Sequence, residues 1–509
     1  MRSVSERFET TRRPQKSTSG PLRGPRSLLT IAFHPELGRI GEQAVLAGPT
    51  ALSRLGPVFR TAEGRLVGAL SDPFLSRTPL MLTPEREAVV VHAAPRVDVR
   101  IEDRPVVGEA RIEAEALRHG VTLTLAGRVL LLLHSQTEPE ELLPKYGLVG
   151  ESAALQRVRE EIGLTAALAI PVLLRGESGT GKELVARAIH ASSPRASQPY
   201  VALNMAALNP QTAVAELFGH TRGSFTGAVG AREGYFRDAD GGTLFLDEIG
   251  EASLELQAML LRVLESGEIQ PVGGTGARRV DVRIIAATDA GLDDEVRGGG
   301  FRLALLHRLA GYTLHVPPLR QRRDDIPRLL IHFLAHELRR AGYEDRLAAL
   351  MADASAELGP PLIARLLRAS WPGNVRQLGN AARQMAAMLL AGRGLDGLPD
   401  FGVPAPAEAA EREPEPPPGS GDLTDAALIA AMQAHRWNVG ATARALKMSR
   451  SGLYARMDRC PGIRKAAEIP AAELRAVYTR HDGDLEAIAA ALRVSLRGLQ
   501  MRLRQLKLA

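Results

Sequence analysis

Cysteine and long apolar runs are nearly absent from the sequence. Cys460 is the single cysteine among 509 residues, which excludes a disulfide scaffold and any zinc or iron–sulfur site built on cysteine. No run of about eighteen apolar residues occurs, so we expect no membrane-spanning helix. The basic start, Met1–Arg26, has no apolar stretch behind it, so we do not expect it to be a secretory signal. We therefore expect a cytoplasmic protein without a membrane partner, in a reducing compartment.

Positive charge is concentrated at the C-terminal end. Residues 441–509 carry 14 Lys and Arg against 6 Asp and Glu, so this stretch holds +8 while the whole chain holds +6. A basic end on a near-neutral body predicts a polyanionic partner. The alternative is a solvated helical surface without such a partner.

Length favours two to four domains, and composition shifts mark their boundaries. Residues 1–27 have no periodicity and predict a disordered basic tail. Residues 28–135 hold short apolar runs with a period of two between turn residues, which predicts a β-sandwich. Residues 136–145 form an acidic linker to the next domain.

The middle of the chain has the pattern of an α/β domain. Over residues 146–316, short apolar runs alternate with helical spacing, which predicts a parallel sheet flanked by helices. Helical spacing continues over 317–395, where we expect a helical lid. Residues 396–422 are rich in proline and acids and predict a flexible, extended linker.

An internal repeat fills the C-terminal end. Segments 423–465 and 466–509 match at an offset of 46 residues without a gap, and both have helical spacing. In the first copy, helices over 428–435 and 439–446 and an N-cap at Ser449 predict a helix-turn-helix. The recurring residues include Leu428, His435, Leu446, Ser449, Leu453 and Arg456, which return as Leu474, His481, Leu492, Ser495, Leu499 and Arg502.

A glycine-rich loop of the phosphate-binding kind follows an apolar strand and opens a helical stretch. Its glycines let backbone N–H groups face phosphates, and Lys182 reaches the β- and γ-oxygens. Glu183 stands where Ser or Thr is usual, so Thr180 or water helps to hold Mg²⁺, or the metal is held mainly from elsewhere. The predicted nucleotide-contacting residues are Gly176, Glu177, Ser178, Gly179, Thr180, Gly181, Lys182 and Glu183.

A second, acidic motif lies some sixty residues further on, in Gly241-Gly-Thr-Leu-Phe-Leu-Asp247-Glu248. A buried strand that ends in two acids suits Mg²⁺ binding at Asp247 and water activation at Glu248. The loop and the acidic strand together predict an ATPase that uses ATP and Mg²⁺. A small-molecule kinase shares both parts, so the pair does not name the substrate.

Over about residues 146–393 the chain resembles the bacterial enhancer-binding proteins, the AAA+ activators of sigma-54 RNA polymerase. The most specific motif resembles the family's GAFTGA loop, with Ser224 in place of alanine. The resemblance implies that this loop projects from a ring and contacts the sigma factor; a buried hairpin tip is the alternative. The implied contact residues are Gly223, Ser224, Phe225, Thr226, Gly227 and Ala228.

Four further residues match functional positions of the family. Asn204 resembles the residue that pairs with the catalytic glutamate, here Glu248. Arg302 and Arg308 resemble arginine fingers, which a neighbouring subunit supplies to stabilise transition-state charge. Arg376, in Trp371-Pro-Gly-Asn-Val-Arg376, resembles the sensor II arginine near the γ-phosphate.

The sequence also departs from the family. Asp289 stands at the sensor I position, where its carboxylate should repel the γ-phosphate unless it is protonated or paired. Leu303 and Ala304 stand where acids are common, and Gln377 replaces a usual glutamate. These changes bear on the rate of hydrolysis and leave Lys182, Asp247 and Glu248 intact.

Both ends of the chain resemble known modules. Residues 423–460 resemble the Fis-type DNA-binding domain, and the second copy is either a weaker reader of DNA or a packing module. The implied DNA contacts are Arg450, Ser451, Tyr454 and Arg456, with Arg497 and Gln500 in the second copy.

The N-terminal β domain more loosely resembles a forkhead-associated (FHA) domain, which reads phosphothreonine. Glu42 stands where the family has a phosphate-binding arginine, and Pro79 where it has a histidine. Phosphate reading and a structural or protein-binding sandwich therefore remain alternatives. The candidates for phosphate contact are Ser76, Arg77 and Arg96.

The sequence thus predicts a multidomain chain: an FHA-like β-sandwich, an α/β AAA+ P-loop domain with a helical lid, and all-α helix-turn-helix repeats. The leading hypothesis is an ATP-dependent activator that binds an enhancer site in double-stranded DNA and remodels sigma-54 RNA polymerase. It would be a dimer at rest and a hexameric ring when active, with a phosphothreonine protein as a further partner. The alternative is a DNA-bound regulator or scaffold that binds ATP and hardly hydrolyses it; a metabolic kinase is disfavoured.

Overall fold

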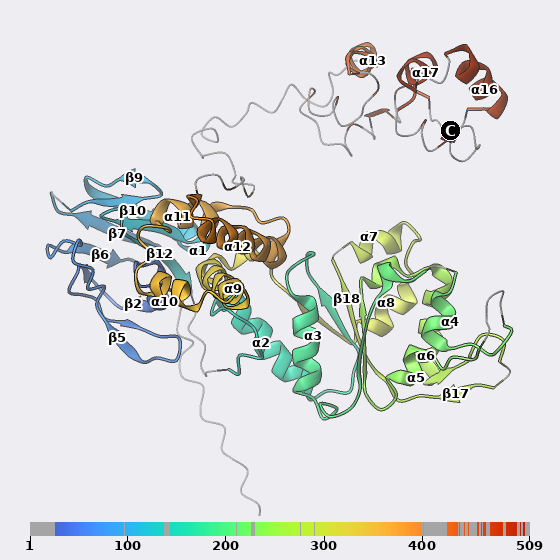
Figure 1. The fold of residues 1–509 in the computed structure, drawn as a ribbon, viewed down its shortest axis with the longest axis horizontal. Coiled ribbons are helices and arrows are strands. Elements are labelled where there is room, and N and C mark those ends of the chain that lie inside the picture. Colours follow the sequence, from blue (N-terminus) through green and yellow to red (C-terminus); the bar gives the residue numbers. More distant parts are fainter. Residues whose placement is uncertain are drawn as a thin grey trace, which may run out of the picture. The chain divides into compact units, whose positions relative to one another are not determined.

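The computed structural model comprises two compact units, Met1–Pro404 and Ala405–Ala509 (Figure 1). In the first unit it describes residues 26–95, 97–136, 143–209, 211–224, 230–274, 276–289, 291–395, 398 and 401. In the second it describes residues 425–435, 437, 442, 446, 453, 456–457, 460, 462–464, 469–481, 485–495, 499 and 502–503. Within these ranges, no helix has the length and apolar character needed to cross a membrane.

The N-terminal part of the first unit is a sandwich of two antiparallel sheets, as predicted. One sheet has the strand order β5-β4-β2-β1-β12-β11-β8-β9 and the other β10-β7-β6-β3, and apolar side chains from both fill the space between them. β1 starts two residues before the predicted domain boundary. The elements are β1 (Arg26–Phe33), η1 (Leu37–Arg39), β2 (Gln43–Leu46), β3 (Thr50–Leu52), β4 (Phe59–Arg60), β5 (Leu66–Gly68), β6 (Leu80–Pro84), β7 (Ala88–Ala93), β8 (Val99–Ile101), β9 (Arg104–Pro105), β10 (Gly108–Glu113), α1 (Ala114–His119), β11 (Val121–Leu125) and β12 (Val129–Gln136).

The central part is the predicted parallel α/β domain. Its sheet has the order β14-β15-β18-β13-β19, and every neighbouring pair is parallel. The strands are β13 (Val172–Arg175), β14 (Tyr200–Asn204), β15 (Thr243–Asp247), β18 (Arg283–Thr288) and β19 (Tyr312–His315), with a small hairpin of β16 (Glu268–Ile269) and β17 (Arg278–Arg279). The helices are α2 (Ala153–Ala166), α3 (Lys182–Ala191), η2 (Met205–Ala207), α4 (Ala213–Phe218), α5 (Tyr235–Asp238), η3 (Ile249–Glu251), α6 (Leu254–Ser266), α7 (Leu292–Arg297) and α8 (Leu303–Leu309).

A helical lid follows β19, as predicted. It consists of η4 (Leu319–Gln321), η5 (Arg323–Asp325), α9 (Ile326–Arg340), α10 (Glu344–Ala352), α11 (Pro360–Arg368) and α12 (Asn374–Leu390). Leu398 and Phe401, which the sequence analysis placed in the linker, are buried in the lid core. The Phe401 ring stacks on Trp371 with ring centres 5.1 Å apart, so lid packing extends beyond residue 395.

The β-sandwich and the lid share one hydrophobic core. Strands β1 and β12 are buried on both faces. Ile31 and Leu131 face the inside of the sandwich, whereas Phe33 and Leu132 pack against the lid. Figure 1 shows the lid helices, in yellow and orange, beside the blue strands. The sandwich is therefore packed against the lid, although the sequence analysis treated the two as separate domains.

The second unit contains α13 (Asp425–Ala434), α16 (Ala471–Arg480) and α17 (Leu485–Leu492). Both ends of α16 lie 46 residues after the ends of α13, which agrees with the repeat. Side chains from both copies form one core, in which Leu428 and Leu474 are fully buried, as are Leu453 and Leu499. The predicted helix over 439–446 and the Ser449 cap lie mostly outside the described residues.

Candidate nucleotide site

The glycine-rich loop connects the carboxyl end of β13 to the start of α3, as the motif requires. Gly179 and Gly181 have positive φ angles of 78° and 104°, which favour glycine. A Cβ on Gly176 would lie 2.6 Å from the Val316 carbonyl oxygen, so that position also needs glycine. The Lys182 ammonium is buried and donates to the Gly176 carbonyl at 2.8 Å. The loop thus has the backbone of a phosphate cradle.

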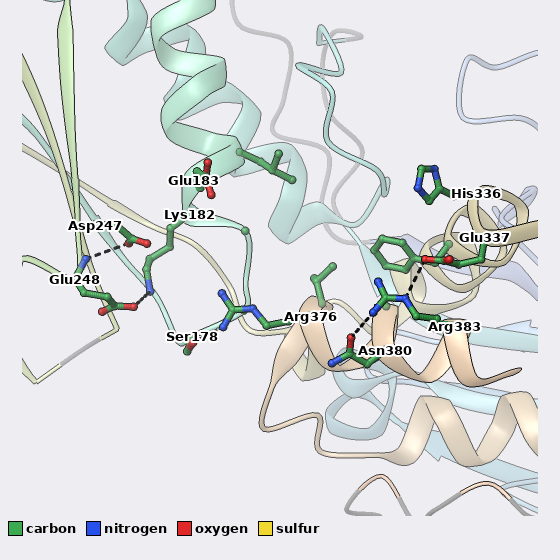
Figure 2. Close-up of a pocket in the computed structure, with 16 residues that line it drawn as sticks. Ser178, Lys182, Glu183, Asp247, Glu248, His336, Glu337, Arg376, Asn380 and Arg383 are labelled. Carbon is green, nitrogen blue, oxygen red and sulfur yellow. Dashed lines mark hydrogen bonds and ion pairs between the residues drawn. The ribbon is translucent and has the colours of Figure 1, made fainter. Parts of the chain in front are cut away.

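Two acids lie opposite Lys182 at the end of β15, as the sequence predicts (Figure 2). The Lys182 Nζ lies 3.8 Å from Glu248 Oε1, and Asp247 Oδ1 accepts from the Glu248 backbone N–H at 3.1 Å. Burial raises the pKa of both carboxyls; for Glu248, the charges of Asp289 and Asp247 add to this effect. A raised pKa at Glu248 suits a group that accepts a proton from water.

A cleft of about 450 Å³ lies between this loop and the lid. One wall carries the phosphate loop and the two acids, and the other comes from α9 and α12. Arg376, at the start of α12, donates to Ser178 Oγ at 3.2 Å, and its backbone N–H donates to Gly179 O at 3.2 Å. The structure therefore brings Arg376 to the phosphate loop, and its role as a sensor II arginine remains a prediction.

Asn374 and Arg320 hold the lid against the loop, and the sequence analysis named neither as a site residue. Asn374 is fully buried; its Oδ1 accepts from the Leu319 N–H at 2.8 Å. Its Nδ2 donates to Ser178 O at 3.0 Å and to Glu177 Oε2 at 3.1 Å. Arg320 makes a bidentate ion pair with Glu177, at 2.6 and 2.8 Å. The position of Asn374 inside the motif 371–376 was the available signal.

Gln377, which stands where the family usually has a glutamate, accepts a hydrogen bond at the start of α12. Its Oε1 accepts from the Gly373 N–H at 2.9 Å, which satisfies a backbone donor at the start of α12. An amide oxygen serves here as well as a carboxylate. This departure from the family therefore leaves the start of α12 intact.

Other predicted site residues have partners of their own or face solvent. The Thr180 hydroxyl donates to Glu177 O at 2.8 Å, and Glu183 pairs with Arg187 at 2.9 Å. Asn204 Oδ1 accepts from the Ala206 N–H at 2.9 Å. Asp289 is exposed at the end of β18. The catalytic and metal-binding roles assigned to these residues remain predictions.

The two predicted arginine fingers lie on the surface near α6 and α8. Arg302 is exposed, and its Nε donates to Leu254 O at 3.3 Å. Arg308 is exposed as well, with Glu265 4.0 Å away. Neither lines the cleft of the same subunit. Leu303 and Ala304, beside Arg302, are also exposed.

Residues 225–228 of the predicted sigma-contact loop lie outside the described residues. Its start is described: the Ser224 N–H donates to Thr221 O at 3.2 Å. At the base, His220 forms β-bridges with Arg232 and with Val272. The base of the loop therefore also includes the connection between β16 and β17, and the projection of the loop remains a prediction.

Of the predicted DNA contacts, Arg456 is the one that the structure describes. Its Nη2 donates to Asp425 Oδ1 at 2.7 Å, and its side chain is 24% exposed. Arg450, Ser451, Tyr454, Arg497 and Gln500 lie outside the described residues. An ion pair that ties Arg456 to α13 gives this residue a structural role within the first copy.

In the β-sandwich, Glu42 forms an ion pair with Arg39. The Arg39 Nε and Nη2 donate to Glu42 Oε2 at 3.1 and 2.9 Å, and both side chains are buried. At another place in the sandwich, the loops that carry Arg54 and Ser76 contact each other: the Arg54 N–H donates to Ser76 O at 3.0 Å. Arg77 is exposed beside them, and Arg96 lies outside the described residues. The sequence analysis did not name Arg54.

Comparison with known proteins places these parts in a family. The chain matches the Sigma-54 interaction domain over residues 148–315, the AAA+ ATPase lid domain over 320–395, and the bacterial regulatory protein, Fis family, over 425–459. It is 36% identical to the anaerobic nitric oxide reductase transcription regulator NorR of Vibrio vulnificus (strain YJ016) over 452 residues, 81% of this chain and 85% of that protein. The chain therefore belongs to the sigma-54-dependent transcriptional activators, as the motifs indicated.

Two other similar proteins are matched over a smaller share of their length. The chain is 48% identical to the DNA-binding transcriptional regulator NtrC of Escherichia coli (strain K12) over 269 residues, 52% of this chain and 55% of that protein. It thus spans about half the length of NtrC. The crystal structure of NtrX from Brucella abortus in complex with ATP is 35% identical, with a TM-score of 0.44, and covers 62% of this chain and 69% of NtrX.

Proposed function

We propose that the protein hydrolyses ATP to remodel sigma-54 RNA polymerase and so activates transcription from the DNA sites that it binds. The observation that carries this proposal is the convergence of Lys182, Asp247, Glu248 and Arg376 on one cleft between the Sigma-54 interaction domain and the lid. As the relatives' names concern transcription regulation, the same broad role is proposed here. The place of action is the bacterial cytoplasm, where the polymerase and the DNA are found.

In this proposal each residue of the cleft has a separate task. The loop amides and Lys182 bind the phosphates, and Glu248 orients and deprotonates the attacking water. Arg376 moves from Ser178 to the γ-phosphate. Mg²⁺ usually binds through one or two carboxylates plus substrate phosphates, so Asp247, with or without Thr180, is a sufficient protein ligand. When bound there, the ion would neutralise charge on the transferred phosphoryl group.

The exposed arginines fit a site that is completed by a second subunit. Arg302 and Arg308 lie on the exposed surface outside their own cleft, where each would enter the cleft of a neighbouring subunit. Subunits joined in this way would form a ring, with a hexamer as the proposed active state and a dimer at rest. The loop 223–228, rising from the base at His220, would then act on the sigma factor. Thr226→Ala is expected to lose transcription activation to a greater extent than ATP hydrolysis.

One observation favours a second candidate, a DNA-bound regulator that binds ATP with little hydrolysis. Asp289 lines a second pocket together with Glu177 and Ser178 of the phosphate loop, and its charge adds to burial in raising the pKa of Glu248. A negative charge at Asp289 would repel the γ-phosphate of bound ATP. Asp289→Asn would then increase turnover, and a reduced rate in this variant would contradict this candidate.

We also propose that the β-sandwich binds a phosphothreonine segment at Arg54, Ser76 and Arg77 rather than at Glu42. The bond between the Arg54 and Ser76 backbones brings a guanidinium and a hydroxyl into one loop cluster, the pair that a phosphate needs. Binding of a phosphothreonine peptide to the full chain, compared with its unphosphorylated form and with Arg54→Ala, tests this. Equal affinity for both peptides would exclude it.

Steady-state ATP hydrolysis by the full chain across protein concentration tests the main proposal. The full chain is needed because the lid shares its core with the sandwich. Turnover per subunit that rises cooperatively with concentration supports a site completed by a neighbour, and Arg302→Ala should abolish the rise. Nucleotide binding without turnover at any concentration would favour the second candidate.

A further inference from the structure

One short stretch of the lid contacts both the phosphate loop and the β-sandwich. We call it the arginine segment; it comprises residues 319–328, directly after the strand β19 and Pro318, and contains four arginines. It forms η4 and η5 and the first turn of α9. Two of its arginines bond to the phosphate loop, and two bond to the sandwich.

On one side the segment holds the phosphate loop. Arg320 makes the bidentate pair with Glu177, and the Arg322 Nη2 donates to Thr180 O at 3.0 Å. Arg322 is 4% exposed. The loop is therefore tied to a segment outside the glycine motif through the Glu177 carboxylate and the Thr180 backbone carbonyl.

On the other side the segment holds the sandwich. The Arg323 Nη1 donates to His119 O at 2.9 Å and to Gly120 O at 3.1 Å, the carbonyls that end α1. Its Nε donates to Leu367 O at 2.7 Å, which ties the same guanidinium to α11 of the lid. Arg328 donates to Gly41 O. The sandwich thus contacts the segment through backbone oxygens, for which arginine has the required fork of donors.

The two central arginines, Arg322 and Arg323, are neighbours that bond in different directions. Burial lowers the pKa of both guanidinium groups, so each depends on its carbonyl partners to offset the loss of water. The backbone around these two residues forms two consecutive tight turns. The Arg322 N–H donates to Leu319 O and the Asp325 N–H donates to Arg322 O, each at 3.0 Å. A displacement of Arg323 therefore displaces Arg322 and its bond to Thr180.

We propose that the arginine segment positions the phosphate loop for nucleotide, and that the β-sandwich holds the segment in place through Arg323. Arg320, Arg322 and Arg323 are then positioning residues that act through the loop and never touch the nucleotide. Release of the sandwich loosens the loop and lowers its affinity for nucleotide. The role rests on the proposed function only in that the loop binds nucleotide.

Amide hydrogen exchange of the full chain without nucleotide tests this proposal. Arg323→Ala is compared with Arg368→Ala, which removes an ion pair of the same lid–sandwich contact, at 2.6 Å from Asp103, but lies on α11 outside the segment. We expect Arg323→Ala to speed exchange in residues 176–181 by about fivefold or more, and Arg368→Ala to leave it within about twofold. In parallel, the Kd for Mg-ADP should rise about fivefold in Arg323→Ala alone.

Equal effects of the two substitutions, or unchanged exchange in Arg323→Ala, would overturn the proposal. If Arg323→Ala speeds exchange throughout the first unit, Arg323→Lys is measured instead, because it keeps the positive charge and loses the forked set of guanidinium donors. Faster exchange confined to residues 176–181 in Arg323→Lys supports the proposal. Unchanged exchange in these residues contradicts it. Exchange needs no hydrolysis. A wild-type chain that fails to hydrolyse ATP would therefore overturn the proposed function and leave this result standing.

Discussion

The two ends of the chain are attached to the rest of the molecule in different ways. The N-terminal sandwich gives the outer faces of β1 and β12 to the lid, so sandwich and lid have a common core. The C-terminal repeats bury their apolar side chains in a core of their own, within a separate compact unit. The comparison shows that the sandwich is packed against the lid that borders the nucleotide cleft, whereas the described apolar side chains of the C-terminal unit pack against one another.

The largest expected effect separates nucleotide binding from DNA binding. Lys182→Ala removes a buried charge from the phosphate loop, and we expect ATP affinity to fall about 100-fold, since a charged hydrogen bond contributes about 3 kcal/mol. DNA affinity without nucleotide should stay the same at fixed salt. Titration with a fluorescent nucleotide and a DNA mobility shift measure the two, and an equal loss in both would contradict the comparison.

Core truncations should separate the two units in a melting experiment. Phe33 lies between sandwich and lid and is 1% exposed, so Phe33→Ala should cost about 3–5 kcal/mol of first-unit stability. Leu453→Ala should cost about 2–5 kcal/mol in the second unit alone. Thermal unfolding followed with and without ATP assigns the transitions. A Phe33→Ala protein whose ATP-sensitive transition keeps its midpoint would break the comparison.

The pH dependence of the first unit should reveal a buried carboxyl within the arginine segment. Burial raises the pKa of Asp325 to about 6, so the folded state favours its protonated form. Its contribution to stability is complete below pH about 4 and is lost as the pH rises through 6, by about 1–3 kcal/mol.

Asp325→Asn should flatten this part of the pH profile. Asp324, whose pKa burial also raises to about 6, remains in both proteins, so their difference reports on Asp325. Denaturant melts at pH 4, 5, 6 and 7 make the measurement. Parallel pH profiles of wild type and variant would show that Asp325 does not titrate in this range.

The smallest expected effect concerns the second unit. Arg456 pairs with Asp425 at 2.7 Å, with side chains 24% and 46% exposed. Such a pair contributes at most about 1 kcal/mol, so Arg456→Ala should lower the second transition slightly and leave ATP hydrolysis unaffected. If the loss of DNA affinity greatly exceeds this, Arg456 also contacts DNA, as the resemblance implied.

Local patterns predicted most of the architecture. The glycine loop, the acidic end of β15 and the parallel sheet over residues 146–316 each depend on residues close together in sequence, and the structure has all three within the predicted ranges. The contacts of Asn374 and Arg320 with Glu177 were missed because both residues lie about 140 to 200 residues from Glu177 in the chain.

The shared core of sandwich and lid had a signal that the sequence analysis did not use. Val129–Leu133 is an unbroken apolar run, and such a run predicts a strand covered on both faces, not on one. What covers the outer face could not be deduced, because Leu130 and Leu132 carry no information on their partner.

Calorimetric unfolding of the full chain, with and without Mg-ATP, tests the central claim most directly. We predict that ATP raises the transition of the first unit, sandwich included, and leaves that of the second unit unchanged. The sandwich should show no transition of its own. A separate sandwich transition that ATP does not move would contradict the coupling of sandwich, lid and nucleotide loop.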